Sequence, residues 1–346
     1  MVDQIKYHMY ISVSGEDHIA IYSVDPSTGF YDLIDRIHLE GKPAPLAISP
    51  DRNYLYAGTR QDFGITSYKI DESTGLISLV DRIVLDADPC YLATDNTGQY
   101  LLSAYYIAGK IAVHKMSNSG IIESVPTVDL YTATGAHCIQ TDPSNKFVFV
   151  PHIADKGPNR IYQFKFNESL GTLSPNSPLL VNPEKRLGPR HYCYHPNMDV
   201  VYFSDEQGCS VSCYSLDISR GTLTHFQTVT TLPSGYKGDN TCSQIQITPS
   251  GKYLYAPNRG HNSIACFSVN NSDGTLNQIG WENTDPVPRA FRIDPSGKFI
   301  FVASLDNGNI ATYRIQDETG KLSLTCTSYL GKDPMWILIA NTLSIK

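Results

Sequence analysis

Alternating apolar and polar positions recur in short stretches along the whole chain, and a turn follows each stretch. IACFSV at 264–269 is one such stretch. A period of two residues is typical of β-strands, and the longer period of an amphipathic helix is absent. The abundance of tyrosine and phenylalanine, 22 and 12 residues, favours the same interpretation. The pattern therefore predicts an all-β protein of short antiparallel strands.

A glycine-containing turn recurs seven times, at intervals of 45 to 53 residues. A glycine at one fixed turn position supplies a positive φ, which other residues tolerate poorly. The seven copies are DPSTGF at 25–30, DESTGL at 71–76, SNSGI at 117–121, NESLGTL at 167–173, DISRGTL at 217–223, NSDGTL at 271–276 and DETGKL at 317–322.

A second landmark, usually led by proline, precedes each turn but occurs only six times. The seventh copy is divided between the chain ends: 332–340 (KDPMWILIA) resembles the first strand of a unit and 8–24 resembles the rest. The six copies are SPDRNYLY at 49–56, DNTGQYLL at 95–102, DPSNKFVF at 142–149, HPNMDVVY at 195–202, TPSGKYLY at 248–255 and DPSGKFIF at 294–301.

Repeats of this length with four strands are typical of propeller blades. We predict a seven-bladed β-propeller with four antiparallel strands per blade, closed by pairing of the N- and C-terminal strands in one split blade. Closure removes the exposed sheet edges that favour aggregation. Residues 1–346 then form a single domain, with extra loop length at 152–160 and 232–240.

Two positions of the repeat carry charge where sister units are small or neutral. One lies six residues before the proline of the second landmark, at the start of the innermost strand, and the other lies ten residues after it, where the second strand ends. Antiparallel strands bring these positions to the same end of the blade, so their side chains should converge on one mouth of the ring. The residues that depart from the pattern are Arg60, His137, Arg190, Glu206, Arg259 and Arg289, and Tyr106 occupies a sister position.

Four arginines around one glutamate predict a cationic mouth that binds a small anionic metabolite. Arginine presents a planar fork to carboxylate or phosphate, and it also stabilises a developing oxyanion. His137 and Glu206 are the acid–base groups of the set, and either is able to activate a water. The sequence alone does not choose between them.

Single members of the set also have structural explanations. Arg60 would pair with Asp62 on a surface loop, and Glu206 would serve as a counter-ion for Arg190 or Arg259. A lone histidine such as His137 is more often a satisfied core residue. We interpret His195 as structural, because its aligned position in the other units is a turn residue, and His191 is open to either role.

Composition narrows the functional classes. The formal net charge is −7 and no run of lysine or arginine exists, which disfavours a nucleic-acid partner. Eight scattered cysteines without a CxxC pair favour free thiols in a reducing compartment. The N-terminus has no apolar signal region and no stretch is long enough to span a membrane, so we expect a cytoplasmic protein without a membrane partner. No metal-binding motif, Walker loop or carboxylate cluster at the mouth is present, and we expect neither a metal nor a cofactor.

The sequence resembles the seven-bladed propeller lactonases of the 6-phosphogluconolactonase and carboxymuconate-cyclase type, essentially from end to end. The segments that carry the resemblance are GPRHYCYHP at 188–196, SDEQGCSV at 204–211, YLYAPNRGHNSIACFSV at 253–269, VPRAFRIDPSGKFIFVAS at 287–304 and DPMWILIAN at 333–341.

The resemblance implies a metal-independent hydrolase of carbohydrate metabolism, in the pentose phosphate pathway, that opens an anionic sugar lactone such as 6-phosphogluconolactone. The cleft residues of the family fall on His137, Arg190, Glu206, Arg259 and Arg289. We therefore expect His137, Glu206 and Arg190 to be catalytic. The expected substrate-binding residues are Arg259, Arg289, Arg60, His191, Gln244 and Tyr106.

Two departures leave other functions open. The family commonly has an acidic residue where this chain has Gln244, and the segment 151–160 is longer and more basic than the family pattern. One alternative is a cycloisomerase that acts on a carboxymuconate-type polycarboxylate. Another is a non-enzymatic propeller scaffold, which would carry apolar patches on its outer faces. We expect a monomer or a weak homo-oligomer.

Overall fold

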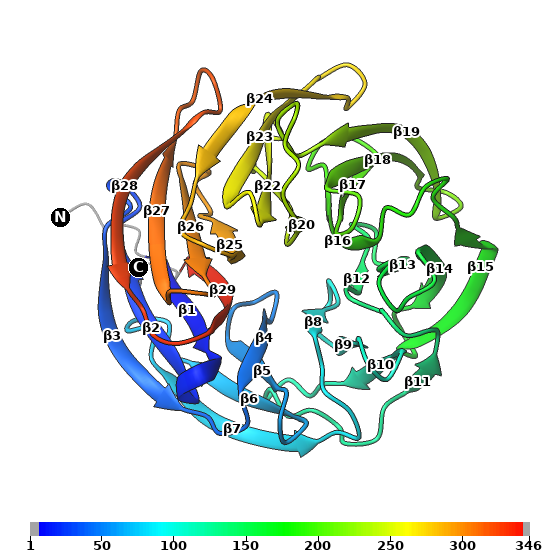
Figure 1. Cartoon of the computed structure of the whole chain (residues 1–346). Helices are drawn as coiled ribbons and strands as arrows, with labels where there is room; N and C mark the ends of the chain where they lie inside the picture. Colours follow the sequence, from blue (N-terminus) through cyan, green and yellow to red (C-terminus); the bar gives the residue numbers. More distant parts are fainter. Residues whose placement is uncertain (1–6, 342–346) are drawn as a thin grey trace.

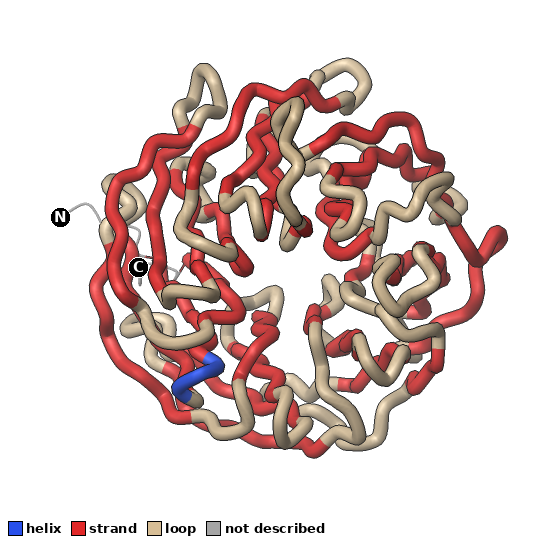
Figure 2. The backbone as a smooth tube through the Cα atoms, viewed as in Figure 1, coloured by secondary structure: helices blue, strands red, loops and turns tan. Residues whose placement is uncertain are grey.

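Seven small sheets form a closed ring around a central axis (Figure 1). The computed structural model describes residues 7–341. Strands dominate the backbone of this part of the chain, and its one helix is the short 3-10 helix η1 (Ser14–Glu16) (Figure 2). No helix within these residues is long and apolar enough to cross a membrane. The prediction of an all-β, seven-bladed propeller is confirmed.

The ring is closed by a blade made from both ends of the chain. The C-terminal strand lies innermost and pairs antiparallel with the first strand, with Tyr7 opposite Asn341 and Tyr10 opposite Leu338. The prediction of a split blade is therefore confirmed. From the axis outward, its strands are β29 (Pro334–Asn341), β1 (Tyr7–Val13), β2 (His18–Val24) and β3 (Tyr31–His38).

The other six blades each follow the chain from the axis to the rim (Figure 1). In one of them the innermost strand is interrupted, and its two short pieces, β20 and β21, both pair with β22. The first two of these blades along the chain contain β4 (Pro43–Ile48), β5 (Tyr54–Thr59), β6 (Gly64–Ile70) and β7 (Ile77–Val84), and then β8 (Tyr91–Thr94), β9 (Tyr100–Tyr105), β10 (Lys110–Lys115) and β11 (Val128–Tyr131). The next two contain β12 (Gln140–Thr141), β13 (Phe147–His152), β14 (Arg160–Asn167) and β15 (Thr172–Val181), and then β16 (Pro189–Tyr194), β17 (Val200–Asp205), β18 (Ser210–Asp217) and β19 (Thr222–Thr230). The last two contain β20 (Thr241–Cys242), β21 (Gln246–Ile247), β22 (Tyr253–Arg259), β23 (Ser263–Val269) and β24 (Leu276–Asn283), and then β25 (Pro288–Ile293), β26 (Phe299–Ser304), β27 (Asn309–Ile315) and β28 (Leu322–Tyr329).

The recurring turn glycines join neighbouring blades. All seven have a positive φ, between 63° and 79°. A Cβ added at Gly171 would lie 2.1 Å from the ring of Tyr100 in the preceding blade, so the turn has no room for a side chain. Tyr202 and Tyr255 are fully buried and donate their hydroxyl hydrogens to the carbonyls of Gly274 and Gly320 at 2.8 Å. The repeat therefore encodes contacts between blades as well as turns within them.

Candidate active site at the ring axis

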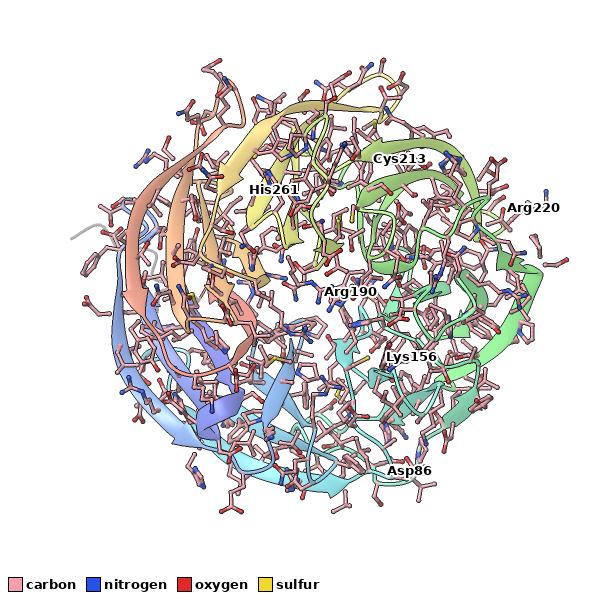
Figure 3. The ribbon with its side chains drawn as sticks, viewed as in Figure 1. Asp86, Lys156, Arg190, Cys213, Arg220 and His261 are labelled. Carbon is pink, nitrogen blue, oxygen red and sulfur yellow. The ribbon has the colours of Figure 1, made fainter. Side chains whose placement is uncertain are left out.

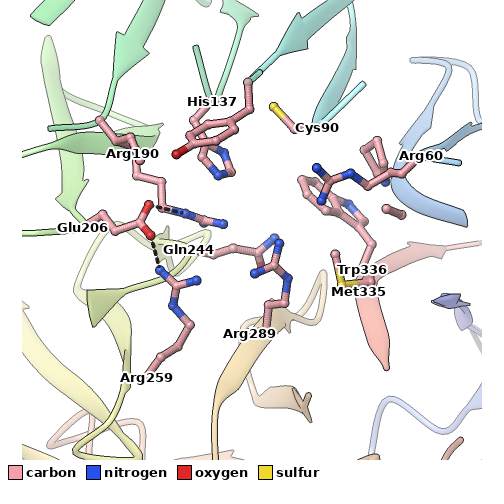
Figure 4. Close-up of a pocket in the computed structure, with 14 residues that line it drawn as sticks. Arg60, Cys90, His137, Arg190, Glu206, Gln244, Arg259, Arg289, Met335 and Trp336 are labelled. Carbon is pink, nitrogen blue, oxygen red and sulfur yellow. Dashed lines mark hydrogen bonds and ion pairs between the residues drawn. The ribbon is translucent and has the colours of Figure 1, made fainter. Parts of the chain in front are cut away.

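A cavity of about 170 Å³ lies where the innermost strands begin, and we call it the axial pocket (Figure 4). All six of the charged or histidine residues that depart from the repeat line it, so the predicted convergence is confirmed. Figure 3 places Arg190 near the centre of the ring and Arg220 at its rim. The lining residues are Ala44, Pro45, Arg60, Cys90, Tyr106, His137, Ile153, Arg190, Glu206, Gln244, Arg259, Arg289, Met335 and Trp336.

Two arginines enter the pocket from bulges in the innermost strands. Pro189 pairs with Asp205 and His191 with Ser204, which leaves Arg190 as an extra residue of β16. The same shift between Pro288 and Ala290 leaves Arg289 as an extra residue of β25. A bulge bends a strand and redirects the side chain of its extra residue. The bulges thus aim two guanidiniums at the axis.

Glu206 connects Arg190 and Arg259 (Figure 4). Its Oε1 accepts a hydrogen bond from Nη2 of Arg259 at 2.7 Å, and its Oε2 lies 3.1 Å from Nε of Arg190. Both guanidiniums also donate to backbone carbonyls, Arg190 to Ser243 at 2.8 Å and Arg259 to Cys242 at 2.7 Å. Burial lowers the pKa of Arg190 to about 10. These contacts fix one polar wall of the pocket.

Arg60 lies on the opposite side of the pocket and pairs with Asp88. Its Nε and Nη2 donate to Oδ2 of Asp88 at 3.2 and 2.7 Å. The structural explanation for Arg60 named the wrong partner, because Asp62 pairs with Arg82 instead. Asp88 precedes the innermost strand of the next blade, and the ring brings it beside Arg60 although the two are far apart in the sequence.

Arg289 has no counter-ion among the described residues. Its guanidinium makes no ion pair or hydrogen bond with any residue in the range 7–341, and it points toward the centre of the pocket (Figure 4). Burial lowers its pKa to about 9, with the neighbouring guanidiniums of Arg190 and Arg259 adding to the effect. The four arginines face only two carboxylates, Glu206 and Asp88. The pocket therefore has a formal excess of two positive charges.

His137 is neutral in this environment. Burial, followed by the charge of Arg190, holds its pKa well below the ordinary value of 6.5. Its Nδ1 has no hydrogen-bond partner among the described residues, and its ring contacts those of Tyr106 and His191 at 5.7 and 5.2 Å between centroids. Figure 4 shows the imidazole projecting toward the guanidiniums. A neutral imidazole placed here is able to accept a proton.

His191 is not among the residues that line the pocket, and its contact with substrate stays a prediction. The bulge gives the pocket position to Arg190, and the next side chain packs behind the wall. The ring of His191 lies 5.1 Å from Tyr91, 5.2 Å from His137 and 5.9 Å from Trp336. His195 is buried and hydrogen bonds to the carbonyl of Gly251, in agreement with a structural role.

The remaining lining residues separate into two kinds. Gln244 is polar; its Oε1 accepts the N–H of Phe291 at 2.9 Å, and its Nε2 makes no hydrogen bond with the described residues. A glutamine thus offers a donor to the pocket where a carboxylate would offer an acceptor. Tyr106 also lines the pocket. Trp336, which was not predicted from the sequence, forms part of the apolar side (Figure 4). The sequence feature that could have identified it is its place beside Met335, at the start of the innermost strand of the split blade.

Among residues 7–341 no group of three or more histidine, cysteine, aspartate or glutamate side chains is arranged to hold a metal ion. A neutral base, a set of guanidiniums with unoccupied donors and an apolar wall lie around one small volume. This combination suits attack of water on the carbonyl of an anionic molecule.

Comparisons with known proteins agree with the fold. A family model described as "Lactonase, 7-bladed beta-propeller" matches residues 39–339. A 6-phosphogluconolactonase of Serratia proteamaculans is 30% identical over 335 residues, which cover 97% of this chain and 99% of that protein. A 6-phosphogluconolactonase of Yersinia pestis is 29% identical over 335 residues, which cover 97% of this chain and 98% of that protein.

Two solved structures show the likeness in three dimensions. The periplasmic gluconolactonase of Pseudomonas aeruginosa superposes with a TM-score of 0.90 at 20% identity, covering 98% of this chain and 100% of that one. A protein from Lactobacillus plantarum superposes with a TM-score of 0.88 at 23% identity, covering 97% and 99%. At these identities the likeness establishes the shared fold.

Proposed function

This chain belongs to the family of seven-bladed β-propeller lactonases, and from that premise we propose that its axial pocket hydrolyses an anionic sugar lactone, most simply 6-phosphogluconolactone. The observation that carries the proposal is Arg289, a guanidinium without a counter-ion among the described residues, in a pocket with two excess positive charges. A phosphate monoester carries a charge of nearly −2 at neutral pH, which matches that excess. The names of the relatives, 6-phosphogluconolactonase, favour the same substrate.

We assign the general base to His137. Oε1 of Glu206 accepts a hydrogen bond from Arg259, and Oε2 lies 3.1 Å from Nε of Arg190, so both oxygens already face guanidiniums. The imidazole of His137 is neutral and faces the same space. Water then loses a proton to His137 as its oxygen attacks the lactone carbonyl.

Arg190 stabilises the oxyanion that this attack creates. Its side chain lines the pocket, while Glu206 and the carbonyl of Ser243 hold the guanidinium in place. The carbonyl is restored when the ring C–O bond breaks, and the proton held by His137 passes to the leaving ring oxygen. The products are an open-chain sugar acid and a regenerated neutral histidine, so no external reactant beyond water is required.

Arg289, with Gln244 beside it, binds the phosphate end of the substrate. Both side chains have donors without partners in the described structure. The apolar wall around Trp336 would face the carbon side of the sugar ring, because an aromatic ring has no hydrogen-bonding demand over its face. Arg60 and Arg259 are already paired and add positive potential to the site.

The first test is hydrolysis of freshly generated 6-phosphogluconolactone, followed by a dehydrogenase that oxidises the product, against the spontaneous rate. We expect acceleration by the wild type and its loss in His137→Ala. No acceleration by the wild type would reject this substrate. Turnover of a carboxymuconate-type polycarboxylate in its place would assign the pocket to a cycloisomerase.

We further propose that the protein acts in the cytoplasm, as a monomer or weak homo-oligomer, on a small anionic metabolite and without a nucleic-acid or membrane partner. All eight cysteines are free thiols, and none is exposed, which suits a reducing compartment. Cell fractionation and size-exclusion chromatography test these two statements separately.

A further inference from the structure

A second cavity, of about 420 Å³, lies at the other end of the ring axis. The innermost strands that begin at the axial pocket end here: Arg289 lines the first cavity and Arg292 the second, and Gln244 and Gln246 are divided in the same way. The two cavities share no lining residue. We call the second one the far cavity.

Arg292 departs from the repeat at its own position. The equivalent residues of the other six units are uncharged: Ala47, Ala93, Gln140, Cys193, Gln246 and Leu338. The side chain of Arg292 is accessible to solvent along the axis, although the surrounding blades desolvate it and lower its pKa. It makes no hydrogen bond or ion pair with any residue in the range 7–341. A cation without a structural partner occupies a place that the fold fills elsewhere with neutral residues.

Arg52 is the second guanidinium of the far cavity. It has a φ of +65°, and glycine with a positive φ stands at the same position of three other units, as Gly98, Gly251 and Gly297. Fold alone would favour glycine here as well, so the side chain needs another explanation. The one hydrogen bond that the side chain of Arg52 makes within the described chain is a contact of 3.3 Å from Nη1 to the carbonyl of Asn341.

The nearby carboxylates do not neutralise these two arginines. Asp294 lines the far cavity, but its oxygens accept hydrogen bonds from its own turn, at Ser296, Lys298 and Phe299. Asp51 is engaged in the same way by Ser49 and Asn53. Glu72 lines an adjacent cavity with Arg52 and forms no ion pair with it. Among the residues that the structure describes, the far cavity therefore presents two guanidiniums and no free carboxylate.

Aromatic side chains lie between the two cavities. Trp336 lines the axial pocket, and its ring lies 5.4 Å from that of Tyr91. Tyr91 in turn interacts electrostatically with Arg292. The rings of Tyr91, His191 and Trp336 contact one another, and Trp336 lines the axial pocket but not the far cavity.

We propose that the far cavity is a second anion site, in which Arg52 and Arg292 bind a phosphate group distinct from any substrate in the axial pocket. Two planar guanidinium forks match the oxygens of a phosphate. The group is supplied either by inorganic phosphate or by a phosphorylated sugar acid. This inference rests on the far cavity alone and does not depend on the reaction at the axial pocket.

Calorimetric titration of the full chain with inorganic phosphate tests the proposal, and titration with 6-phosphogluconate in parallel distinguishes the two sources. Arg292→Gln and Arg52→Gly are the test variants, and Arg289→Gln is the matched control in the axial pocket. Glycine at position 52 preserves the backbone, since three sister units have it. Thermal melting confirms that each variant is folded.

We expect a binding event that weakens at least tenfold in both Arg292→Gln and Arg52→Gly and is retained in Arg289→Gln. Lactone turnover in phosphate-free buffer should be unchanged in the two far-cavity variants. The tighter of the two ligands identifies the source of the phosphate group. Phosphate binding that is lost only in Arg289→Gln, or no binding of either ligand that the far-cavity variants weaken, would overturn the proposal.

Discussion

Oε2 of Glu206 lies 3.1 Å from Nε of Arg190, and both side chains belong to the wall of the axial pocket. Arg190 is only 3% exposed and Glu206 14%, so little solvent screens the pair. The same carboxylate binds Arg259 through its other oxygen. This arrangement supports the proposal that Glu206 positions two guanidiniums.

Replacing Glu206 should impair both catalysis and folding. In Glu206→Gln we expect kcat for 6-phosphogluconolactone to fall by about 10²-fold, because a small displacement of a catalytic group has effects of that size. We expect the free energy of unfolding to fall by about 3 kcal/mol, as when one partner of a buried pair is removed. Steady-state kinetics and urea unfolding measure the two effects. The control is Glu318→Gln, at an exposed glutamate. An unchanged kcat in Glu206→Gln would show that Glu206 does not position Arg190.

His137→Gln removes the proposed base while keeping a side chain of similar length. We expect kcat to fall by about 10²- to 10⁴-fold with little change in KM, the range for loss of general base catalysis. The pH profile adds a second readout. Because the pKa of His137 is well below 6.5, kcat/KM of the wild type should stay level as the pH falls through 6.5 and decline only at lower pH. A decline centred at pH 6.5 would contradict the lowered pKa of His137. The control is His225→Gln, at an exposed histidine.

Arg289→Gln tests the recognition of the phosphate. Loss of one hydrogen bond to a charged group costs about 1.5–3 kcal/mol, which corresponds to a rise of about 10- to 100-fold in KM for 6-phosphogluconolactone. The KM for unphosphorylated gluconolactone should not change, because that lactone lacks the anion. Equal effects on both lactones would instead give Arg289 a role at the carbonyl. Arg220→Gln, at the rim of the ring in Figure 3, is the control.

Buried histidines should make the fold sensitive to acid. Burial lowers the pKa of His114 and of His152 to about 4, whereas the unfolded chain titrates near 6.5. The unfolded state therefore binds more protons between these values, so stability is complete above pH 6.5 and falls as the pH drops toward 4. Each histidine accounts for about 3 kcal/mol over this window.

Urea unfolding across this pH range measures the effect. His114→Gln should remove one part of the pH dependence, while His225→Gln, on the surface, should leave it unchanged. A slope that stays the same in His114→Gln would show that this histidine titrates normally in the folded state.

The split blade predicts a matched pair of leucine variants. Leu338 of β29 is 5% exposed and pairs with Tyr10 of β1, whereas Leu324 of β28 is 56% exposed. Leu338→Asp places a charge inside the closing sheet, and we expect a loss of about 4 kcal/mol or more. Leu324→Asp should change stability by less than about 0.5 kcal/mol. Thermal unfolding measures the loss of stability, and size-exclusion chromatography detects any aggregation through an exposed β1. Equal stability of the two variants would contradict closure of the ring at β29.

The repeat in the sequence determined the architecture. Seven turn glycines at regular spacing give seven blades, and a seventh landmark divided between 332–340 and 8–24 gives the split blade. The same alignment placed Arg190 and Arg259 at one mouth, because antiparallel strands fix which ends of a blade coincide. These features follow from chain order and strand period, both of which are readable without coordinates.

The tertiary structure alone decided which groups meet. The repeat assigns a residue to a ring position, but bulges at Arg190 and Arg289 choose which side chain enters the pocket, and so His191 lies behind it. Pairing of Arg60 with Asp88 depends on contact between blades. Whether Arg289 and Arg292 have counter-ions depends on side-chain packing across the ring, which no local pattern of the sequence encodes.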